Sequence, residues 1–210
     1  MHYNRANVCR YKEDYSKAVE CYKKANALDP SLPAQDAIEI IVRWVSRVSD
    51  LISRKGRVKL KKLDSLVTTL PPTSKNIIQG RKRIPISSLN RGSNEGKVVA
   101  LKLLVDVVRS NEPPGCFVMI DEEYSCIAVS IYHLDSEVSS KLNDKDVFYL
   151  LDPFLKVIDL ALPEGKGNPA VYQIRYNCLQ VAEPHLFLVN GKVMLESYAH
   201  AQVKLDNFDL

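Results

Sequence analysis

The apolar positions of the chain change period from helical spacing at the amino end to near-continuous strand runs at the carboxy end. In the first part, one set of branched residues recurs three and four positions apart: Ile38, Ile41, Val45, Val48 and Ile52. This spacing is typical of a helix with a single apolar stripe. It predicts one long helix over Ser31 to Ser53, in which Ala37, Trp44 and Leu51 widen the stripe.

Residues 1–30 show a denser pattern, in which aromatic and small residues share a helical spacing. Tyr15, Ala18, Tyr22, Ala25 and Pro30 stand where a 34-residue helix pair requires aromatic, small, aromatic, small and terminal proline residues. The match predicts one tetratricopeptide unit, with the following long helix as its cap. Because one unit cannot bury its own apolar face, we expect the chain to be the carboxy-terminal part of something longer.

From Lys97 onward the runs have the length and composition of β-strands. The expected strands are Lys97 to Arg109, Phe117 to Ile120, Tyr124 to Tyr132, Asp146 to Leu151, Leu155 to Leu162, Tyr172 to Val181, Leu186 to Val189 and Lys192 to Leu195. Asn190 and Gly191 predict a type I′ hairpin turn. A long first strand, a hairpin and an excursion near Asp135 to Asp144 favour a five-stranded oligonucleotide/oligosaccharide-binding (OB) fold closed into a β-barrel.

The predicted architecture is therefore α+β and multidomain. The expected units are a tetratricopeptide unit with capping helix over residues 1–53, a basic linker with a short helix near Leu63 to Leu70 over residues 54–83, an OB-fold barrel over residues 84–196, and a tail over residues 197–210.

Charge is divided unevenly between these segments. The linker holds ten basic residues and the single acid Asp64, whereas the chain from Ile84 onward holds 11 basic and 17 acidic residues. The linker is thus strongly basic and the barrel acidic. The linker could be a solvated connection, a nuclear-import signal, or a contact for ribosomal or other nucleic-acid phosphates. The candidate nucleic-acid or ribosome contacts are Arg57, Lys59, Lys61 and Lys62.

An acidic barrel disfavours binding of single-stranded nucleic acid, which needs a positive groove with stacking aromatics. Tyr124, Tyr132, Phe148 and Tyr149 are available as such platforms, but strand aromatics at these positions are more often core packing. Trp44 could likewise anchor a peptide, although packing beside the apolar stripe is the favoured interpretation.

Nothing in the chain predicts catalysis, a metal or a cofactor. The five cysteines are scattered without CxxC spacing, and we expect reduced thiols, with a Cys116–Cys126 pairing across a hairpin as the minor alternative. The four histidines, His2, His133, His185 and His200, lie in no nucleophile–base context, and no phosphate-binding loop or HExxH helix is present. No apolar run approaches the roughly 20 residues of a membrane span, and no membrane contact is expected.

The succession of these segments resembles the carboxy-terminal half of the tetratricopeptide repeat protein 5 (stress-responsive activator) family. The residues that carry the resemblance are His2 to Val8, Ala25 to Pro30, Ser53 to Gly56, Lys61 to Leu63, Ser87 to Asn90 and Leu188 to Lys192. Together they extend over nearly the whole chain.

The resemblance implies a non-enzymatic adaptor in the cytoplasm and nucleus. Its implied partners are the amino-terminal peptide of nascent tubulin at the ribosome, leading to tubulin mRNA decay, and acetyltransferase coactivators in stress transcription. The family's peptide groove is lined by the first helices of several repeats, and its positions carried over here are Asn4 and Asn7, with Arg5 as a lesser candidate. The alternative is a nucleic-acid or chromatin-binding module that acts through the basic linker and the OB fold.

Overall fold

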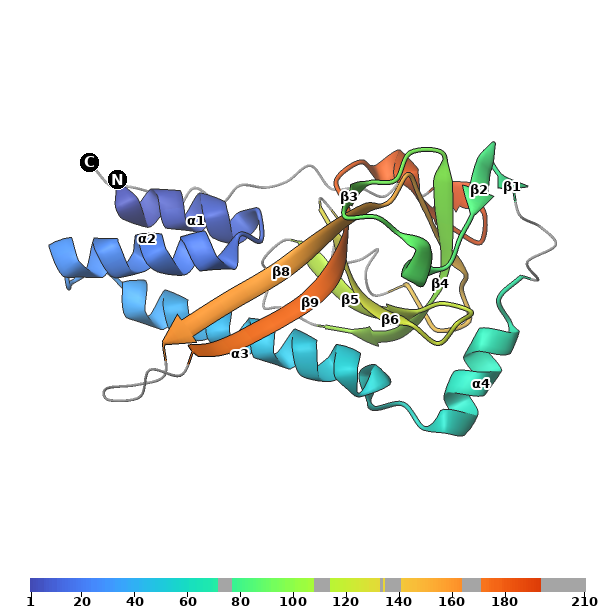
Figure 1. Cartoon of the computed structure of the whole chain (residues 1–210), viewed down its shortest axis with the longest axis horizontal. Coiled ribbons are helices and arrows are strands. Elements are labelled where there is room, and N and C mark those ends of the chain that lie inside the picture. Colours follow the sequence, from blue (N-terminus) through green and yellow to red (C-terminus); the bar gives the residue numbers. More distant parts are fainter. Residues whose placement is uncertain (72–76, 108–113, 133, 135–140, 164–170, 194–210) are drawn as a thin grey trace.

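The computed structural model places three helices on one side of a strongly curved sheet and a fourth helix at its far end (Figure 1). It describes all residues except 72–76, 108–113, 133, 135–140, 164–170 and 194–210. The helices are α1 (His2–Tyr11), α2 (Tyr15–Leu28), α3 (Ala34–Ser53) and α4 (Leu60–Thr68), with short 3₁₀ turns η1 (Lys55–Arg57), η2 (Ile86–Ser88) and η3 (Pro184–Leu186). The predicted helix pair, long helix and short fourth helix are all present within a few residues.

The described strands number eleven. They are β1 (Ile77–Ile78), β2 (Arg81–Arg83), β3 (Gly92–Ser93), β4 (Lys97–Asp106), β5 (Gly115–Ile120), β6 (Cys126–Ile131), β7 (Phe148–Leu151), β8 (Phe154–Pro163), β9 (Val171–Val181), β10 (Phe187–Val189) and β11 (Lys192–Val193). Their main order is β11-β10-β7-β4-β5-β6-β9-β8-β3, with β1 and β2 attached beside β4. The β6–β9 and β2–β4 pairs are parallel, and the other pairs are antiparallel.

The strand core matches the OB fold, but the prediction of five strands in a closed barrel was wrong. The sheet has many more strands, and its described ladder runs from β11 to β3 without closing. The open edges of the described sheet are β11 and β3. Between β7 and β8 the chain turns sharply, since Asp152 has φ +46 and Pro153 lacks a backbone donor. Strand β7 pairs with β4 and β10, and strand β8 pairs with β9 and β3, so this turn connects two strands that are not neighbours in the sheet.

The bend of the sheet is built into β4. The first half of β4 pairs with β7 and the second half with β5, and the register of the β4–β5 pair shifts between Leu103 and Val105. Such a bulge increases local twist and curvature. Gly56 of η1, at φ +64, lies against this bulge, and a Cβ at that position would come within 2.9 Å of Val105 Cγ2. The glycine that ends the helical pattern in the sequence is thus required by a close approach.

Two large apolar cores, together with two smaller clusters, hold the molecule together. One fills the inside of the curved sheet with residues such as Leu101, Phe117, Val129, Phe148 and Phe187, all fully buried. The other is shared between the helices and the outer face of the sheet, and joins Tyr22, Ile41 and Val45 to Val118 and Ala128. Helix α3 therefore caps α2 on one side and covers strands β5, β6 and β9 on the other.

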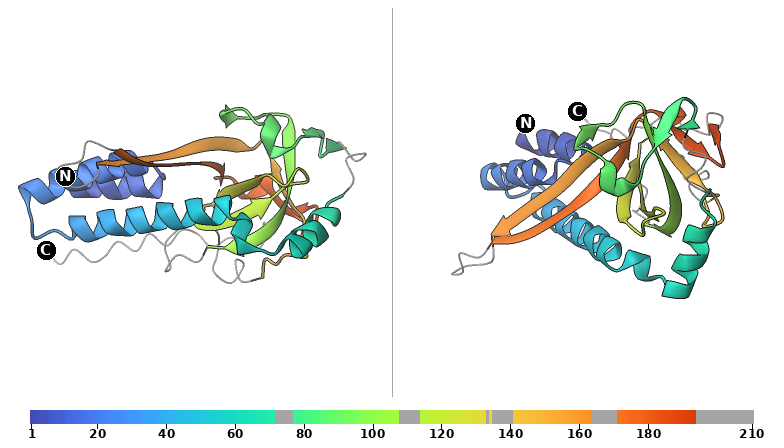
Figure 2. Two further views of the ribbon diagram at one scale, coloured as in Figure 1. Left: turned by 60° about the horizontal axis from the view of Figure 1, so that its bottom comes forward. Right: turned by 45° about the vertical axis from the view of Figure 1, so that its right-hand side comes forward.

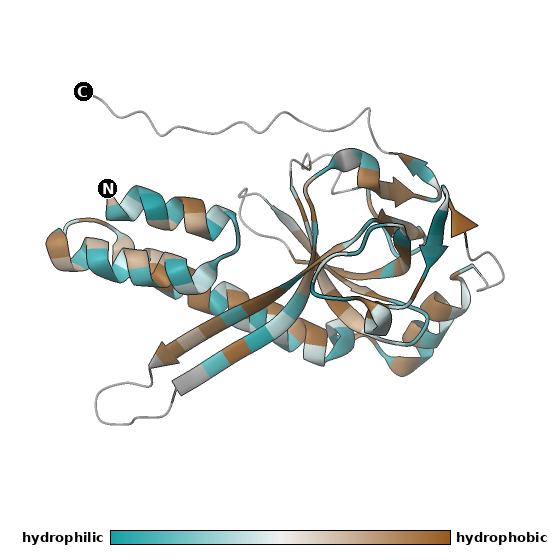
Figure 3. Cartoon of the chain, turned by 45° about the horizontal axis from the view of Figure 1, so that its top comes forward, coloured by the Kyte–Doolittle hydropathy of each residue, from teal (hydrophilic) through white to brown (hydrophobic). Residues whose placement is uncertain are grey.

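Strands β8 and β9 form a long hairpin that leaves the barrel and extends beside the helices (Figure 2). The hydropathy colouring shows apolar segments along this hairpin and in the strands of the barrel (Figure 3). The type I′ turn between β10 and β11 is confirmed, since Asn190 and Gly191 have φ values of +51 and +81. Of the predicted excursion near Asp135 to Asp144, residues 135–140 lie outside the described residues, as does the predicted tail over residues 197–210.

The segment expected to be a linker contributes to the sheet. Strand β2 pairs with β4, and Arg81 donates two hydrogen bonds to Asp152 Oδ2, at 2.8 and 2.6 Å. Arg83 is buried, with its guanidinium 3.2 Å from Glu122 and a hydrogen bond to the Pro71 carbonyl. The basic triplet of the sequence is therefore partly neutralised by acids of the barrel.

Candidate functional site

Helix α1 presents the three residues proposed for the peptide groove. Asn4, Arg5 and Asn7 are all exposed, and Asn4 and Asn7 lie three positions apart on one helical face. Asn7 Oδ1 accepts a hydrogen bond from the hydroxyl of Tyr22 on α2, whose ring packs edge-on to Tyr3. The amide of Asn7 is thereby oriented, because Tyr22 is fully buried. The structure brings Asn4 and Asn7 together on one exposed face of α1.

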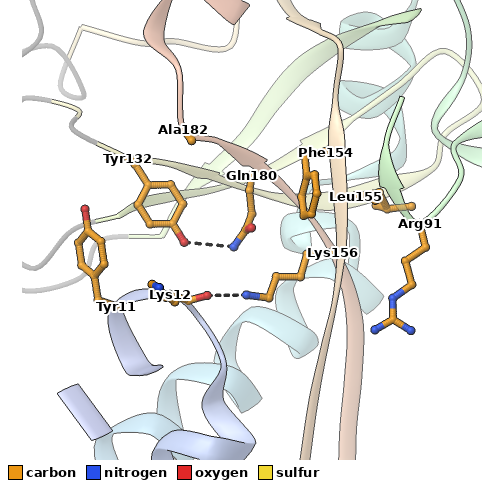
Figure 4. A pocket seen from close by; sticks show the side chains of 10 residues that line it. Tyr11, Lys12, Arg91, Tyr132, Phe154, Leu155, Lys156, Gln180 and Ala182 are labelled. Carbon is orange, nitrogen blue, oxygen red and sulfur yellow. Dashed lines mark hydrogen bonds between the residues drawn. The ribbon is translucent and has the colours of Figure 1, made fainter. Parts of the chain in front are cut away.

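The same helical face continues to a pocket where α1 meets the barrel. Tyr11 and Lys12 at the end of α1 line a cavity of about 560 Å³ with Arg91, Tyr132, Phe154 and Lys156 of the sheet side (Figure 4). Tyr11 packs edge-on to Tyr132, with 5.5 Å between ring centroids. We call this cavity the junction pocket. No local pattern in the sequence predicts this pocket, because its walls come from segments far apart along the chain.

A buried carboxylate lies next to the junction pocket. Glu13, in the turn between α1 and α2, is 5% exposed and has φ +56. Its carboxylate accepts hydrogen bonds from Ser130 Oγ at 2.6 Å, the Tyr132 hydroxyl at 3.0 Å and Gln180 Nε2 at 2.7 Å. Burial, together with the negative charge of Glu13, raises the pKa of Tyr132, so its hydroxyl stays protonated and donates. Glu13 thus ties the helical repeat to strands β6 and β9.

Further hydrogen bonds join the helices to strand β8. The ammonium of Lys156 donates to the carbonyl of Lys12, and Ser16 Oγ donates to the carbonyl of Asp159 at 2.6 Å. Together with Glu13 and the shared core, these contacts fix α1 relative to the barrel. The α1 face and the junction pocket therefore form one surface of fixed geometry.

The four cations proposed for nucleic acid or ribosome contact fall into two groups. Arg57 pairs with Asp50 at 2.6 Å and Lys62 pairs with Asp144 at 2.7 Å. Lys59 and Lys61 are exposed and make no ion pair with any residue that the structure describes. Only half of the predicted basic site is therefore free of intramolecular neutralisation.

The proposed stacking aromatics are used mainly for packing. Phe148 and Tyr149 are buried, and Phe148 stacks on Phe187 with 5.7 Å between ring centroids. The Tyr124 hydroxyl donates to Asp64 at 2.8 Å. Tyr132 lines the junction pocket, and Trp44 is buried in the shared core.

The face of an OB fold that usually binds oligonucleotides is formed by its second and third strands. In this chain these strands correspond by order and pairing to β5 and β6. Their outward-facing residues Cys116, Val118 and Ala128 are at most 4% exposed, since they belong to the core shared with α1–α3. The helical segment therefore occupies the usual nucleic-acid face.

Within the described part of the chain, no group of three or more His, Cys, Asp and Glu side chains converges as a metal site would require. His2 lies on α1 and His185 in η3, while His133 and His200 are outside the described residues. The cysteines are free thiols. Cys116 lies opposite Ser130 and Cys126 opposite Ile120, so the register holds the two sulfurs at opposite ends of the hairpin.

Comparison with known proteins agrees with this architecture. Residues 80–203 match the family described as the tetratricopeptide repeat protein 5 OB fold domain, and residues 1–32 match the tetratricopeptide repeat. The chain belongs to the tetratricopeptide repeat protein 5 family. Both matches are to domain types that commonly act as scaffolds for other molecules.

Similar proteins include tetratricopeptide repeat protein 5 of Mus musculus, 29% identical over 212 residues, and that of Homo sapiens, 27% identical over 205 residues. Each alignment covers 91% of this chain and 44% of the relative. The chain thus spans less than half the length of these relatives. Among its described helices, none has the length and apolar composition needed to cross a membrane.

Proposed function

We propose that this chain is a non-enzymatic adaptor that binds protein or peptide partners through the exposed face of α1 and the adjoining barrel surface. The observation that carries the proposal is the shared core, which holds the helical repeat rigidly on the sheet. Asn4 and Asn7 side chains on that face have amide groups able to satisfy the backbone of a bound peptide. Arg5 adds a cation for an acidic group of the ligand.

The family and the repeat favour two specific partners. One is the amino-terminal peptide of nascent tubulin at the ribosome, whose binding would lead to decay of tubulin mRNA in the cytoplasm. The other is the group of acetyltransferase coactivators, which the protein would scaffold in the nucleus during stress transcription. Tetratricopeptide repeats support both roles because they bind extended segments along a surface of helices.

A nucleic-acid or chromatin-binding module remains the second candidate. The exposed cations of Lys59 and Lys61 favour it, while the burial of the β5–β6 face under α3 disfavours a contribution from the OB fold. Binding of this kind would show an affinity that falls steeply with rising salt.

The adaptor proposal is tested by capture on an immobilised tubulin amino-terminal peptide, with the chain in the longest form that its gene encodes. Asn4→Ala removes one hydrogen-bonding amide and should weaken capture by roughly tenfold, which corresponds to about 1.4 kcal/mol. Gln35→Ala is the matched control, since Gln35 is an exposed amide on α3. Unchanged capture by the Asn4 variant would remove Asn4 from the binding site.

A further inference from the structure

The junction pocket combines positive charge with exposed aromatic surface. Lys12 and Arg91 are exposed, and neither forms an ion pair with any residue in the described ranges. Elsewhere, Arg81 and Arg83 of β2 and Lys62 of α4 each lie against a carboxylate. The pocket therefore concentrates cations that the chain does not neutralise, although the barrel segment as a whole is acidic.

The aromatic wall of the pocket is accessible. Phe154, the first residue of β8, is 45% exposed and Tyr11 is 37% exposed. Figure 4 shows the side chains of Phe154 and Lys156 on the same side of β8, with Arg91 across the strand. An exposed apolar ring with cations in the same pocket suits a ligand that has one apolar group and flanking negative charges.

We propose that the junction pocket is a second binding site, for an acidic peptide segment that carries a single aromatic or large aliphatic residue. The apolar residue packs against Phe154 and Tyr11, and the flanking carboxylates lie near Lys12, Arg91 and Lys156. This site goes beyond the α1 face because it needs neither Asn4 nor Asn7.

Two observations favour a peptide over a nucleic acid as occupant. The usual oligonucleotide face of the fold is buried under α3, and the pocket offers only three cations on a barrel that carries a net negative charge. A chain of phosphates would bring more negative charge than the three cations of the pocket can neutralise, whereas a short peptide places its few charges within the pocket. In addition, Asn4, Asn7 and Tyr11 follow one helical face, so a peptide could continue from the pocket along α1.

The test is fluorescence anisotropy with the whole chain and a labelled peptide in which one phenylalanine lies between two pairs of aspartates. Binding should weaken at least tenfold for Arg91→Glu and for Phe154→Ser, and should be unchanged for Lys192→Glu, a lysine exposed on β11. A peptide with lysines in place of the aspartates, and one with serine in place of the phenylalanine, should bind at least tenfold more weakly. Thermal unfolding of each variant confirms that it is folded.

Equal binding of the acidic and basic peptides would overturn the proposal, as would full affinity in folded Arg91→Glu and Phe154→Ser. A single-stranded RNA of similar length that binds as tightly at physiological salt, and is weakened by the same substitutions, would also overturn it. Because the Asn4 capture experiment uses another surface and another peptide, its result can fail or succeed independently of this one.

Discussion

Glu13 is the side chain on which the attachment of the helical repeat most depends. Its left-handed backbone conformation costs about 1–2 kcal/mol for a residue other than glycine. The cost is offset by three hydrogen bonds that the carboxylate accepts from Ser130, Tyr132 and Gln180. Nothing in the sequence distinguishes Glu13 from an ordinary solvated acid in a helix–helix turn, since its partners lie more than 115 residues away.

Replacing Glu13 with alanine should lower the free energy of unfolding by about 2–4 kcal/mol, because several buried donors lose their acceptor. Urea denaturation monitored by circular dichroism measures the change. Glu20→Ala is the control, since Glu20 is exposed on α2 and pairs only with Lys24, and it should leave stability within experimental error. Equal stability of the Glu13 variant and the native chain would show that the buried carboxylate does not anchor the repeat.

Asp152 gives the attachment of strand β2 a dependence on pH. Its carboxylate accepts from Arg81 and from the Gly96 amide, and the Arg81 hydrogen bonds lower the pKa of Asp152 below its ordinary value. A depressed pKa means that the stabilisation is fully present above the unfolded-state pKa, about 3.9, and is lost as pH falls through the folded-state pKa. The β2 edge should therefore weaken in acid.

Asp152→Asn should cost about 1–2 kcal/mol of unfolding free energy at pH 7, and the difference from the native chain should shrink below pH 4. Urea titrations at pH 7, 5 and 3 measure it. Glu39→Gln, an exposed acid of α3, serves as the control and should show no such trend. A difference that stays constant across this pH range would contradict the assigned role of the Arg81–Asp152 pair.

The elements with strong periodicity were predictable and the short ones were not. The stripe of Ile38, Ile41, Val45 and Val48 predicts α3, and these residues are buried in the structure. The valine-rich run likewise predicts β4. Strands β1, β2 and β3 are two or three residues long, too short to show a period of two. The basic triplet Arg81 to Arg83 resembles linker sequence because the acids that pair with it lie far away along the chain. Asp152, between β7 and β8, pairs with Arg81, and Glu122, in the β5–β6 turn, pairs with Arg83.

Local sequence also could not show that the sheet has more than five strands and stays open. Asp152 and Pro153 separate β7 from β8, but which strand each of these two pairs with depends on contacts far apart along the chain. That choice is set by long-range packing of β7 on β4 and of β8 on β9. Likewise, the pattern of α3 predicts an apolar stripe but not that the stripe covers the sheet as well as α2.

The molecule as a whole is one body in which a helical repeat covers the outer face of an OB fold. The core shared by Tyr22, Ile41, Val118 and Ala128 makes separate unfolding of the two parts costly, since either part alone would expose a continuous apolar surface. This arrangement fixes the α1 face beside the junction pocket and removes the usual oligonucleotide surface. The proposed adaptor function depends on that rigid arrangement of repeat and sheet.

The most direct measurement is native-state hydrogen exchange by mass spectrometry in increasing urea. Peptides from α3, around residues 41–48, and from the β5–β6 hairpin, residues 115–131, should lose protection at the same urea concentration and with the same denaturant dependence. Coincident loss is the result expected for a single cooperative unit. Loss of protection in the helices at a lower urea concentration, with the strands still protected, would contradict the claim that repeat and barrel form one binding surface.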